Sequence, residues 1–472
     1  MRCSTRLLLI TAFAIFAGLS LLAASTRTVA REVAPRSPAA QISSSEDNND
    51  EAWDWPSLLS SAPPSSPTPC PSALAADAAA GLVAERRAAF PAGCPNASSA
   101  LYASLRRDLR WLGEVRVDAP SLLRTLLHRT VRPGKAAALL LNRTGTYVVA
   151  RADFWEDQHA RRCVRGLRET FADAFGGFAA RARAPLVLVF NFESNARETR
   201  KSFPTLSYCK RLPRGGAAPA ADAANDILFP RYYFDENAKW SEARGSPFRL
   251  DGLPPHPWAK KAAAAVFRGT ATDVSRVALA ALSDRWNASG GALALDAAVT
   301  GYTSSVAQAW RRLGGLSAFG GMPAHRKKLS MPAQVSGYKY IVNVEGAGWA
   351  CADRLPALLT SDSVVLKQAS RNVEWWYALL QPWVHYVPVD AHWADLRERL
   401  DCLRKRDALA ARVAAEGRRL AQALSTDAAL CFAWNVLQRA SRLAPPEKWE
   451  ALAKEVQRIA EGGENGLEMR PL

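Results

Sequence analysis

The chain has 472 residues, 49% of them hydrophobic, which is enough apolar material for two or three folded domains and excludes a disordered protein. Lysine and arginine total 61 against 44 for aspartate and glutamate, which gives a formal charge of +17. Such a charge suits an anionic membrane surface, a nucleic acid or an anionic small substrate. The basic residues are spread along the chain, often as pairs on helical stretches, so we expect no nucleic-acid partner.

The first apolar stretch, LLLITAFAIFAGLSLLAA at residues 7–24, carries no charge. Its length is close to the roughly 20 residues that a helix needs to span a bilayer. Because it is longer than the apolar region of an ordinary secretory signal, we interpret it as an uncleaved signal-anchor, with residues 1–6 in the cytosol. Cleavage near Ser25 is the alternative, and both interpretations place the rest of the chain in a secretory lumen.

Residues 25–85 are rich in serine, proline and alanine and include the run SSAPPSSPTPCPS. This composition cannot bury a hydrophobic core. We therefore expect a stem between the membrane anchor and the folded region.

A lumenal chain can carry glycans and disulfides. Asn96, Asn142 and Asn287 each begin a glycosylation acceptor triplet. If Cys3 faces the cytosol, an odd number of cysteines remains in the oxidising compartment, so at least one is free or pairs between chains. The sequence has no C-x-x-C pair and no H-E-x-x-H motif, so we expect no metal site and no cofactor.

Beyond the stem, short apolar runs alternate with longer amphipathic ones, which predicts an α/β fold built around parallel sheets. Residues 167–175 form one amphipathic run, and leucines at helical spacing in residues 395–424 predict helices with a face to bury. The runs expected to form strands are 185–192, 226–234, 260–269, 338–346, 363–368 and 384–389.

Two of these expected strands end in residues suited to a diphosphate. In doubly wound sheets, ligands bind outside the carboxyl ends of the strands. Glycines there let backbone N–H groups approach an anion, and the guanidinium fork of arginine can hold two phosphate oxygens. The alternative is a tight turn between core elements, with the arginines paired to nearby aspartates. The candidate residues are Arg268, Gly269, Thr270 and Arg276 after the first run, and Glu345, Gly346, Gly348, Trp349 and Arg354 after the second.

The segments FRGTATDVSR, YKYIVNVEGAGWACADR, SVVLKQ and EWWYALLQPWVHYVPV, in this order within residues 155–437, resemble the CAP10-like family. This family holds the protein O-glucosyltransferases and capsule xylosyltransferases of glycosyltransferase family 90. The resemblance implies a GT-B fold of two Rossmann-like domains, a UDP-glucose or UDP-xylose donor, and inversion at the anomeric carbon without a metal. It places an acceptor-side domain at 86–238 and a donor-binding domain at 239–424, with the helices of 425–472 packing back.

The resemblance also assigns roles to single residues. Thr270 and Arg276 match positions that contact the nucleotide sugar, and the turn from Gly346 to Trp349 would wrap the diphosphate together with Arg354. Between Gly346 and Ser363 the chain is slightly longer than its glucosyltransferase relatives.

The general base departs from the family pattern. Relatives end the strand corresponding to PLVLVFNF with an aspartate that takes the acceptor proton, whereas Ser194 stands there in this chain, preceded by Glu193. Serine is no base unaided at neutral pH, so we predict that Glu193 is the base, with Asp226 and Glu345 as the next candidates. The missing aspartate leaves a second hypothesis open, a non-catalytic sugar- or nucleotide-binding protein on the same scaffold.

Two further expectations concern disulfides and location. Cys431 matches a family cysteine that pairs with one near the start of the catalytic region, here Cys94 or Cys70. The carboxyl end, GLEMRPL, carries no Lys-Asp-Glu-Leu retrieval signal. Together with the anchor, this favours a single-pass type II protein of the Golgi membrane with a protein or glycan acceptor, the endoplasmic reticulum or secretion being the alternatives.

Overall fold

The computed structural model describes most of the chain from Cys94 onward, with several gaps. Among the described residues no helix is both long and apolar enough to cross a membrane, and residues 7–24 lie outside them. The described residues are 71, 94–96, 98–112, 115–127, 135–192, 203–212, 226–231, 256–289, 294–303, 306, 323, 326–346, 351–352 and 354–472.

The first sheet has six strands in the order β13-β2-β1-β3-β4-β6. The pairs β1/β2, β1/β3 and β13/β2 are antiparallel, whereas β3/β4 and β4/β6 are parallel. This sheet is therefore mixed, and only part of it has the parallel pairing that the sequence pattern predicts. Its strands are β1 (Ala136–Asn142), β2 (Gly145–Arg151), β3 (Leu186–Asn191), β4 (Thr205–Ser207), β6 (Ile227–Leu228) and β13 (Leu467–Pro471).

The antiparallel part begins with a tight turn between β1 and β2. The side-chain Oδ1 of Asn142 accepts hydrogen bonds from the backbone N–H groups of Thr144 (2.9 Å) and Gly145 (3.1 Å). Gly145 has a φ of 151°, a conformation that glycine adopts at little cost. The strand β1 is buried along almost its whole length, so its residues do not alternate in polarity and the pattern does not predict this hairpin.

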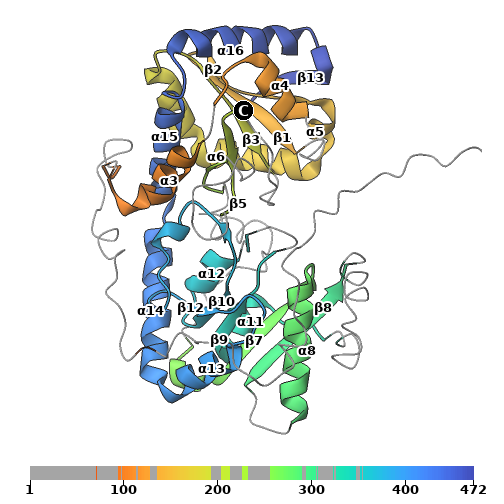
Figure 1. The fold of residues 1–472 in the computed structure, drawn as a ribbon, viewed down its shortest axis with the longest axis vertical. Helices are drawn as coiled ribbons and strands as arrows, with labels where there is room; N and C mark the ends of the chain where they lie inside the picture. The colour runs from red at the N-terminus through yellow and green to blue at the C-terminus, as the bar shows by residue number, and fades with distance from the viewer. Residues whose placement is uncertain are drawn as a thin grey trace, which may run out of the picture. The chain divides into compact units, whose positions relative to one another are not determined.

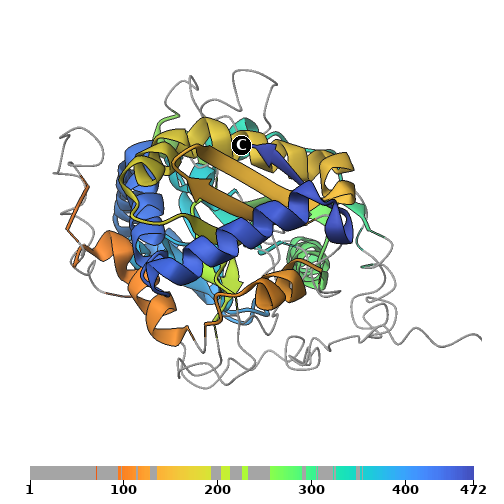
Figure 2. The same cartoon turned by 90° about the horizontal axis from the view of Figure 1, so that it is seen from above.

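Two long helices cover the first sheet. α6 (Gln158–Arg181) packs against β1 and β2, and α16 (Pro446–Glu461) packs against β3 and β13 on the opposite face (Figure 2). α15 (Thr426–Ala440) lies against α6, so the last helices join the sheet built from the first strands. The other helices of this part are α3 (Ala103–Trp111), α4 (Ala119–Leu127), α5 (Ala152–Glu156) and the 3₁₀ turns Ala100–Tyr102 and Glu464–Gly466.

The second sheet has five strands, all parallel, in the order β12-β10-β9-β7-β8 (Figure 1). Four of them coincide with apolar runs that the sequence predicts to be strands, and β8 is an additional one. Its strands are β7 (Ala262–Ala271), β8 (Leu295–Tyr302), β9 (Tyr338–Asn343), β10 (Val364–Gln368) and β12 (Val387–Val389). Its helices are α8 (Val274–Ala288), α11 (Met331–Gly337), α12 (Leu355–Leu359), α13 (Leu396–Lys405), α14 (Asp407–Ala423) and the 3₁₀ turns Trp258–Lys260 and Tyr377–Leu379.

The order of the second sheet defines where a ligand should bind. The chain passes from β7 through α8 to β8 on one side, and the next strand, β9, pairs with β7 on its other side. Strand order thus reverses between β7 and β9. In open parallel sheets the carboxyl ends of the strands at such a reversal flank the ligand crevice.

A short third sheet links the two others. β5 (Lys210–Arg211), which follows β4, pairs antiparallel with β11 (Asn372–Val373), which follows β10. The residues just before each of these two strands lie near the end of β9. Cys209 precedes β5 and is bonded to Cys351, and Ser370 precedes β11 and donates to Glu345.

Candidate functional site

Arg276 connects the carboxyl ends of β7 and β9. It lies in the first turn of α8, and its Nε and Nη2 donate to the backbone carbonyl of Glu345 at 3.2 and 2.8 Å. Its Nη1 donates to the carbonyl of Thr270 at 2.9 Å. The structure therefore places a half-buried guanidinium at the reversal of strand order, where the sequence predicts a diphosphate site.

Arg354 lies at the same strand ends. Its Nε donates to the Oδ1 of Asn343 at 3.3 Å, and its Nη2 donates to the carbonyl of Val344 at 3.1 Å. The guanidinium carbons of Arg354 and Arg276 lie 5.0 and 6.0 Å from the ring centroid of Phe267 in β7. Two cations thus share one aromatic neighbour, an arrangement that a bound anion would stabilise.

Asn343 adds a polar group at this place. Its side chain is fully buried, and its Nδ2 has no hydrogen-bond partner among the described residues. A buried donor left in this way is uncommon in folded proteins and calls for an acceptor. Its position beside Arg354, at the end of β9, agrees with an anionic ligand at this edge of the sheet.

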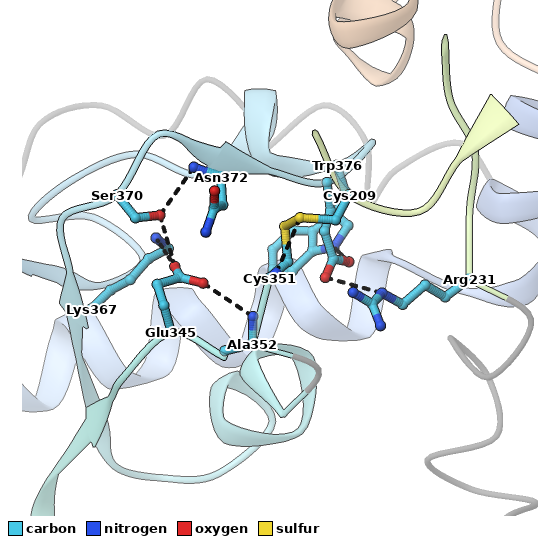
Figure 3. Close-up of a disulfide and its surroundings, with 10 residues drawn as sticks. Cys209, Arg231, Glu345, Cys351, Ala352, Lys367, Ser370, Asn372 and Trp376 are labelled. Carbon is cyan, nitrogen blue, oxygen red and sulfur yellow. Dashed lines mark hydrogen bonds and ion pairs between the residues drawn. A yellow bond between two sulfur atoms is a disulfide. The ribbon is translucent and has the colours of Figure 1, made fainter. Parts of the chain in front are cut away.

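The carboxylate of Glu345 is buried and held by three groups (Figure 3). Its Oε1 lies 3.3 Å from the Nζ of Lys367 and accepts from the Oγ of Ser370 at 3.0 Å. Its Oε2 accepts from the backbone N–H of Ala352 at 3.2 Å. These contacts tie Ala352, in the connection between β9 and α12, to β10 and to the segment that precedes β11.

Further hydrogen bonds tie the neighbouring strand ends together. The amide side chain of Gln368, at the end of β10, accepts from the N–H of Glu345 at 3.1 Å and donates to the carbonyl of Ala391 at 2.7 Å. The indole of Trp393 donates to the carbonyl of Ser275 in α8 at 3.0 Å. The strand ends β7, β9, β10 and β12 therefore form one connected frame around Arg276.

Arg268 has a different environment from Arg276. Its Nη2 forms an ion pair with Asp296 of β8 at 2.7 Å, and its Nη1 donates to the backbone carbonyl of the same residue at 2.6 Å. Tyr338 donates to Asp296 from the other side, and burial together with Asp296 raises the pKa of this tyrosine to about 12. In this structure Arg268 holds β7 and β8 together.

Gly269 and Thr270 lie at the end of β7. A Cβ atom on Gly269 would lie 3.1 Å from the ring of Phe267 and 3.8 Å from the Nη1 of Arg276, so a glycine leaves room for this stacking. The side chain of Thr270 is exposed. Gly346 is half-buried beside Glu345.

Several predicted residues are not placed by the structure. Glu193, Ser194, Gly348 and Trp349 lie outside the described residues. Asp226, the second carboxylate considered as a base, directly precedes β6, is almost completely buried and accepts a hydrogen bond from Ser207. Its carboxylate is therefore turned into the core in this structure.

The described residues contain two disulfides with both partners identified. Cys94 is bonded to Cys431, one of the two pairings that the resemblance allows, and Cys209 is bonded to Cys351, a pair that the sequence did not predict. Cys402 is also disulfide-bonded. Disulfides of this kind fit an oxidising compartment.

The three glycosylation triplets differ in their surroundings. Asn96 is exposed, and Asn142 lies in the turn between β1 and β2. Asn287 lies in the last turn of α8, where its side-chain amide donates to the carbonyl of Leu295 at 3.2 Å. Asn287 is therefore the least suited of the three to carry a glycan.

The sequence did not indicate several parts of the site. These are Lys367, Gln368, Ser370 and the Cys209–Cys351 disulfide. The one available signal was KQAS at the end of the run SVVLKQAS, where polar residues end a buried strand and continue just beyond it. Among the described residues no group of three or more His, Cys, Asp or Glu side chains could hold a metal ion.

A family model described as Glycosyl transferase family 90 matches residues 187–461, which is more than half of the chain. This protein therefore belongs to glycosyltransferase family 90.

Named relatives agree with this assignment. Protein O-glucosyltransferase 3 of Rattus norvegicus is 32% identical over 247 residues, which cover 51% of this chain and 42% of the relative. Protein O-glucosyltransferase 1 of Rattus norvegicus is 31% identical over 229 residues, covering 46% and 54%. Protein O-glucosyltransferase 2 of Danio rerio is 38% identical over 107 residues, covering 22% and 21%. The aligned part thus spans about half of each of these relatives or less.

Proposed function

We propose that this protein is a glycosyltransferase that moves glucose or xylose from a UDP-sugar to a hydroxyl group of a protein or glycan acceptor. The observation that carries the proposal is the pair Arg276 and Arg354 at the reversal of strand order in a parallel sheet. Family membership and the names of the relatives supply the reaction class.

The donor's diphosphate would lie between these two arginines. When the bond between the sugar and the diphosphate breaks, negative charge accumulates on the leaving phosphate oxygens. Fixed guanidinium groups stabilise this charge, because their N–H donors are already oriented and need no rearrangement during the reaction. Arg276 and Arg354 meet this requirement, since backbone carbonyls of the strand ends hold both of them. We expect this stabilisation to replace a metal ion.

The reaction would invert the anomeric carbon in a single displacement. An acceptor oxygen attacks the anomeric carbon, the UDP leaves from the opposite face, and a base takes the proton of the acceptor hydroxyl. We assign the base to Glu193. Glu345 is a weaker candidate because its carboxylate is already held by Lys367, Ser370 and Ala352, and Asp226 is buried.

The location proposed for this activity is the Golgi lumen. Residues 7–24 would anchor the chain in the membrane as a single-pass type II protein, with the folded region on the lumenal side. The disulfides support an oxidising compartment.

A donor screen tests the proposal. The purified lumenal region is incubated with UDP-glucose, UDP-xylose and other UDP-sugars, and released UDP is measured with and without candidate acceptors. We expect release from one or two donors and none from the others. Tight UDP binding without release from any donor, with any acceptor, would instead support the non-catalytic binding protein. Absence of both UDP binding and UDP release would refute the proposal.

A further inference from the structure

The disulfide between Cys209 and Cys351 joins two distant parts of the chain near Glu345 (Figure 3). The two cysteines are 142 residues apart in the sequence, and both are almost completely buried. Cys209 follows β4 of the first sheet, and Cys351 lies in the connection between β9 and α12 of the second sheet. The bond therefore fixes this connection to a segment outside its own sheet.

On one side, the disulfide leads to Glu345 through backbone contacts. Cys351 is followed directly by Ala352, whose N–H donates to the Oε2 of Glu345 at 3.2 Å. The backbone N–H of Cys351 also lies 3.1 Å from the sulfur of Cys209. The Ala352 amide that binds Glu345 is therefore directly next to a disulfide-bonded residue.

On the other side, Cys209 leads back to Glu345 through the third sheet. Cys209 directly precedes β5, which pairs with β11. The N–H of Asn372 in β11 donates to the Oγ of Ser370 at 3.1 Å, and this hydroxyl donates to the Oε1 of Glu345 at 3.0 Å. The contacts thus form a closed ring, in which the disulfide is a covalent link and the Glu345 carboxylate is the meeting point.

The ring includes Glu345, which follows the end of β9. Both arginines of the proposed site donate hydrogen bonds to backbone carbonyls there. Arg276 donates to the carbonyl of Glu345 itself, and Arg354 comes two residues after Ala352 and donates to the carbonyl of Val344. A shift of the connection would therefore change the position of Arg354 relative to Arg276. Each hydrogen bond of the ring contributes only about 1–3 kcal/mol, so the covalent disulfide adds a constraint that these bonds do not supply.

We propose that Cys209 and Cys351 are positioning residues whose disulfide holds the β9–α12 connection against Glu345 and so keeps Arg276 and Arg354 arranged for a nucleotide diphosphate. The part that concerns the ligand rests on the proposed function. The part that concerns the Ala352–Glu345 contact can be tested without any donor.

The test compares two double variants that each remove one disulfide. Cys209→Ser/Cys351→Ser opens the ring, and Cys94→Ser/Cys431→Ser removes a disulfide that lies outside it. Hydrogen exchange is measured on the peptide that contains the Ala352 amide, and the affinity for UDP is measured by calorimetry. We expect faster exchange and roughly tenfold weaker UDP binding in the first variant, because a preorganised site becomes mobile. We expect neither change in the second, although its melting temperature should fall.

Each outcome has a distinct meaning. Unchanged exchange at Ala352 in the first variant would overturn the positioning role, whether or not the protein binds UDP. Faster exchange with unchanged UDP affinity would remove the link between the disulfide and the donor. Wild-type protein that binds no UDP would count against the proposed function, while the exchange result would still decide the positioning role. If the first variant fails to fold, wild-type protein reduced under native conditions replaces it, with peptide mapping to identify the opened disulfide.

Discussion

The guanidinium of Arg276 donates two hydrogen bonds to the backbone carbonyl of Glu345, and these bonds join the first turn of α8 to the end of β9. The two residues are 69 positions apart in the sequence. Their contact closes the gap at the reversal of strand order between β7 and β9. A single arginine therefore holds the two strand ends together through its N–H donors.

Replacing Arg276 by alanine should weaken UDP binding. We expect a loss of roughly 1.5–3 kcal/mol, the contribution of a hydrogen-bonding interaction to a charged group. Calorimetry with UDP measures the effect. Arg397→Ala provides a matched control, because Arg397 is an exposed arginine of α13 that lies over Trp286. Equal UDP affinities of the two folded variants would remove Arg276 from the donor site.

Replacing Glu193 by glutamine should slow the transfer of sugar. The substitution keeps the shape of the side chain and removes its basicity, so we expect a rate decrease of about 10²–10⁴-fold with unchanged UDP affinity. Ser194→Ala should have a much smaller effect, because a hydroxyl there can position groups but cannot take the proton. Steady-state kinetics on both variants measure the difference. A Glu193→Gln enzyme with near-normal rates would mean that the base lies elsewhere, and Glu345 would be tested next.

Replacing Gly417 by alanine should destabilise the fold. A Cβ atom at this position in α14 would lie 2.5 Å from the backbone carbonyl oxygen of His385, which cannot move aside without shifting the chain. We expect a loss of roughly 1–3 kcal/mol in the free energy of unfolding, measured by chemical denaturation. Gly176→Ala in α6 is the control, because nothing lies within 4 Å of its added Cβ and alanine favours a helix. A Gly417→Ala protein as stable as the control would show that the helix does not approach His385 this closely.

Lys261 should make stability depend on pH in the alkaline range. Burial lowers the pKa of Lys261 to about 8 from an ordinary value of 10.5. Between these two pH values the unfolded chain binds a proton that the folded chain lacks, so the contribution of Lys261 to stability rises with pH, by at most about 1.4 kcal/mol per pH unit. The contribution of Lys261 falls as the pH decreases from 10.5 to 8, and it stays constant below pH 8.

The comparison with Lys261→Met isolates this effect, because tyrosines also titrate in the alkaline range. Denaturation at several pH values between 7 and 11 should give a difference in unfolding free energy, wild type minus variant, that increases with pH. A difference that does not change with pH would mean that Lys261 has an ordinary pKa in the folded protein.

Much of the second sheet could be predicted from the sequence. The sequence predicts strands in four apolar runs, and each run overlaps a strand of this sheet. The runs are 260–269, 338–346, 363–368 and 384–389. The strand β8 was less visible, because its sequence LDAAVTGY mixes small and polar residues. The strand order of the first sheet was even harder to predict from the sequence. Its edge strand β13 comes from the last residues of the chain, and local pattern carries no information about a partner more than 300 residues away.

The candidate site shows the same division. The sequence could select the candidates Arg276, Glu345 and Arg354, because glycines and arginines directly after apolar runs indicate an anion site at strand ends. It could not predict that these residues have different contacts. The sequence does not show that Arg268 pairs with Asp296, since this contact depends on the neighbour that β7 acquires in the sheet.

The sequence by itself determined which segments form strands and helices and which chemical groups follow them, because hydrophobic periodicity and residue type act over a few neighbouring residues. The tertiary structure alone decided which of these groups meet. It brought Arg276 to the carbonyl of Glu345, surrounded the Glu345 carboxylate with Lys367, Ser370 and Ala352, and paired Cys209 with Cys351. These contacts join residues from different strands, and the order of strands in a sheet is fixed by packing of the whole chain rather than by any local stretch of it.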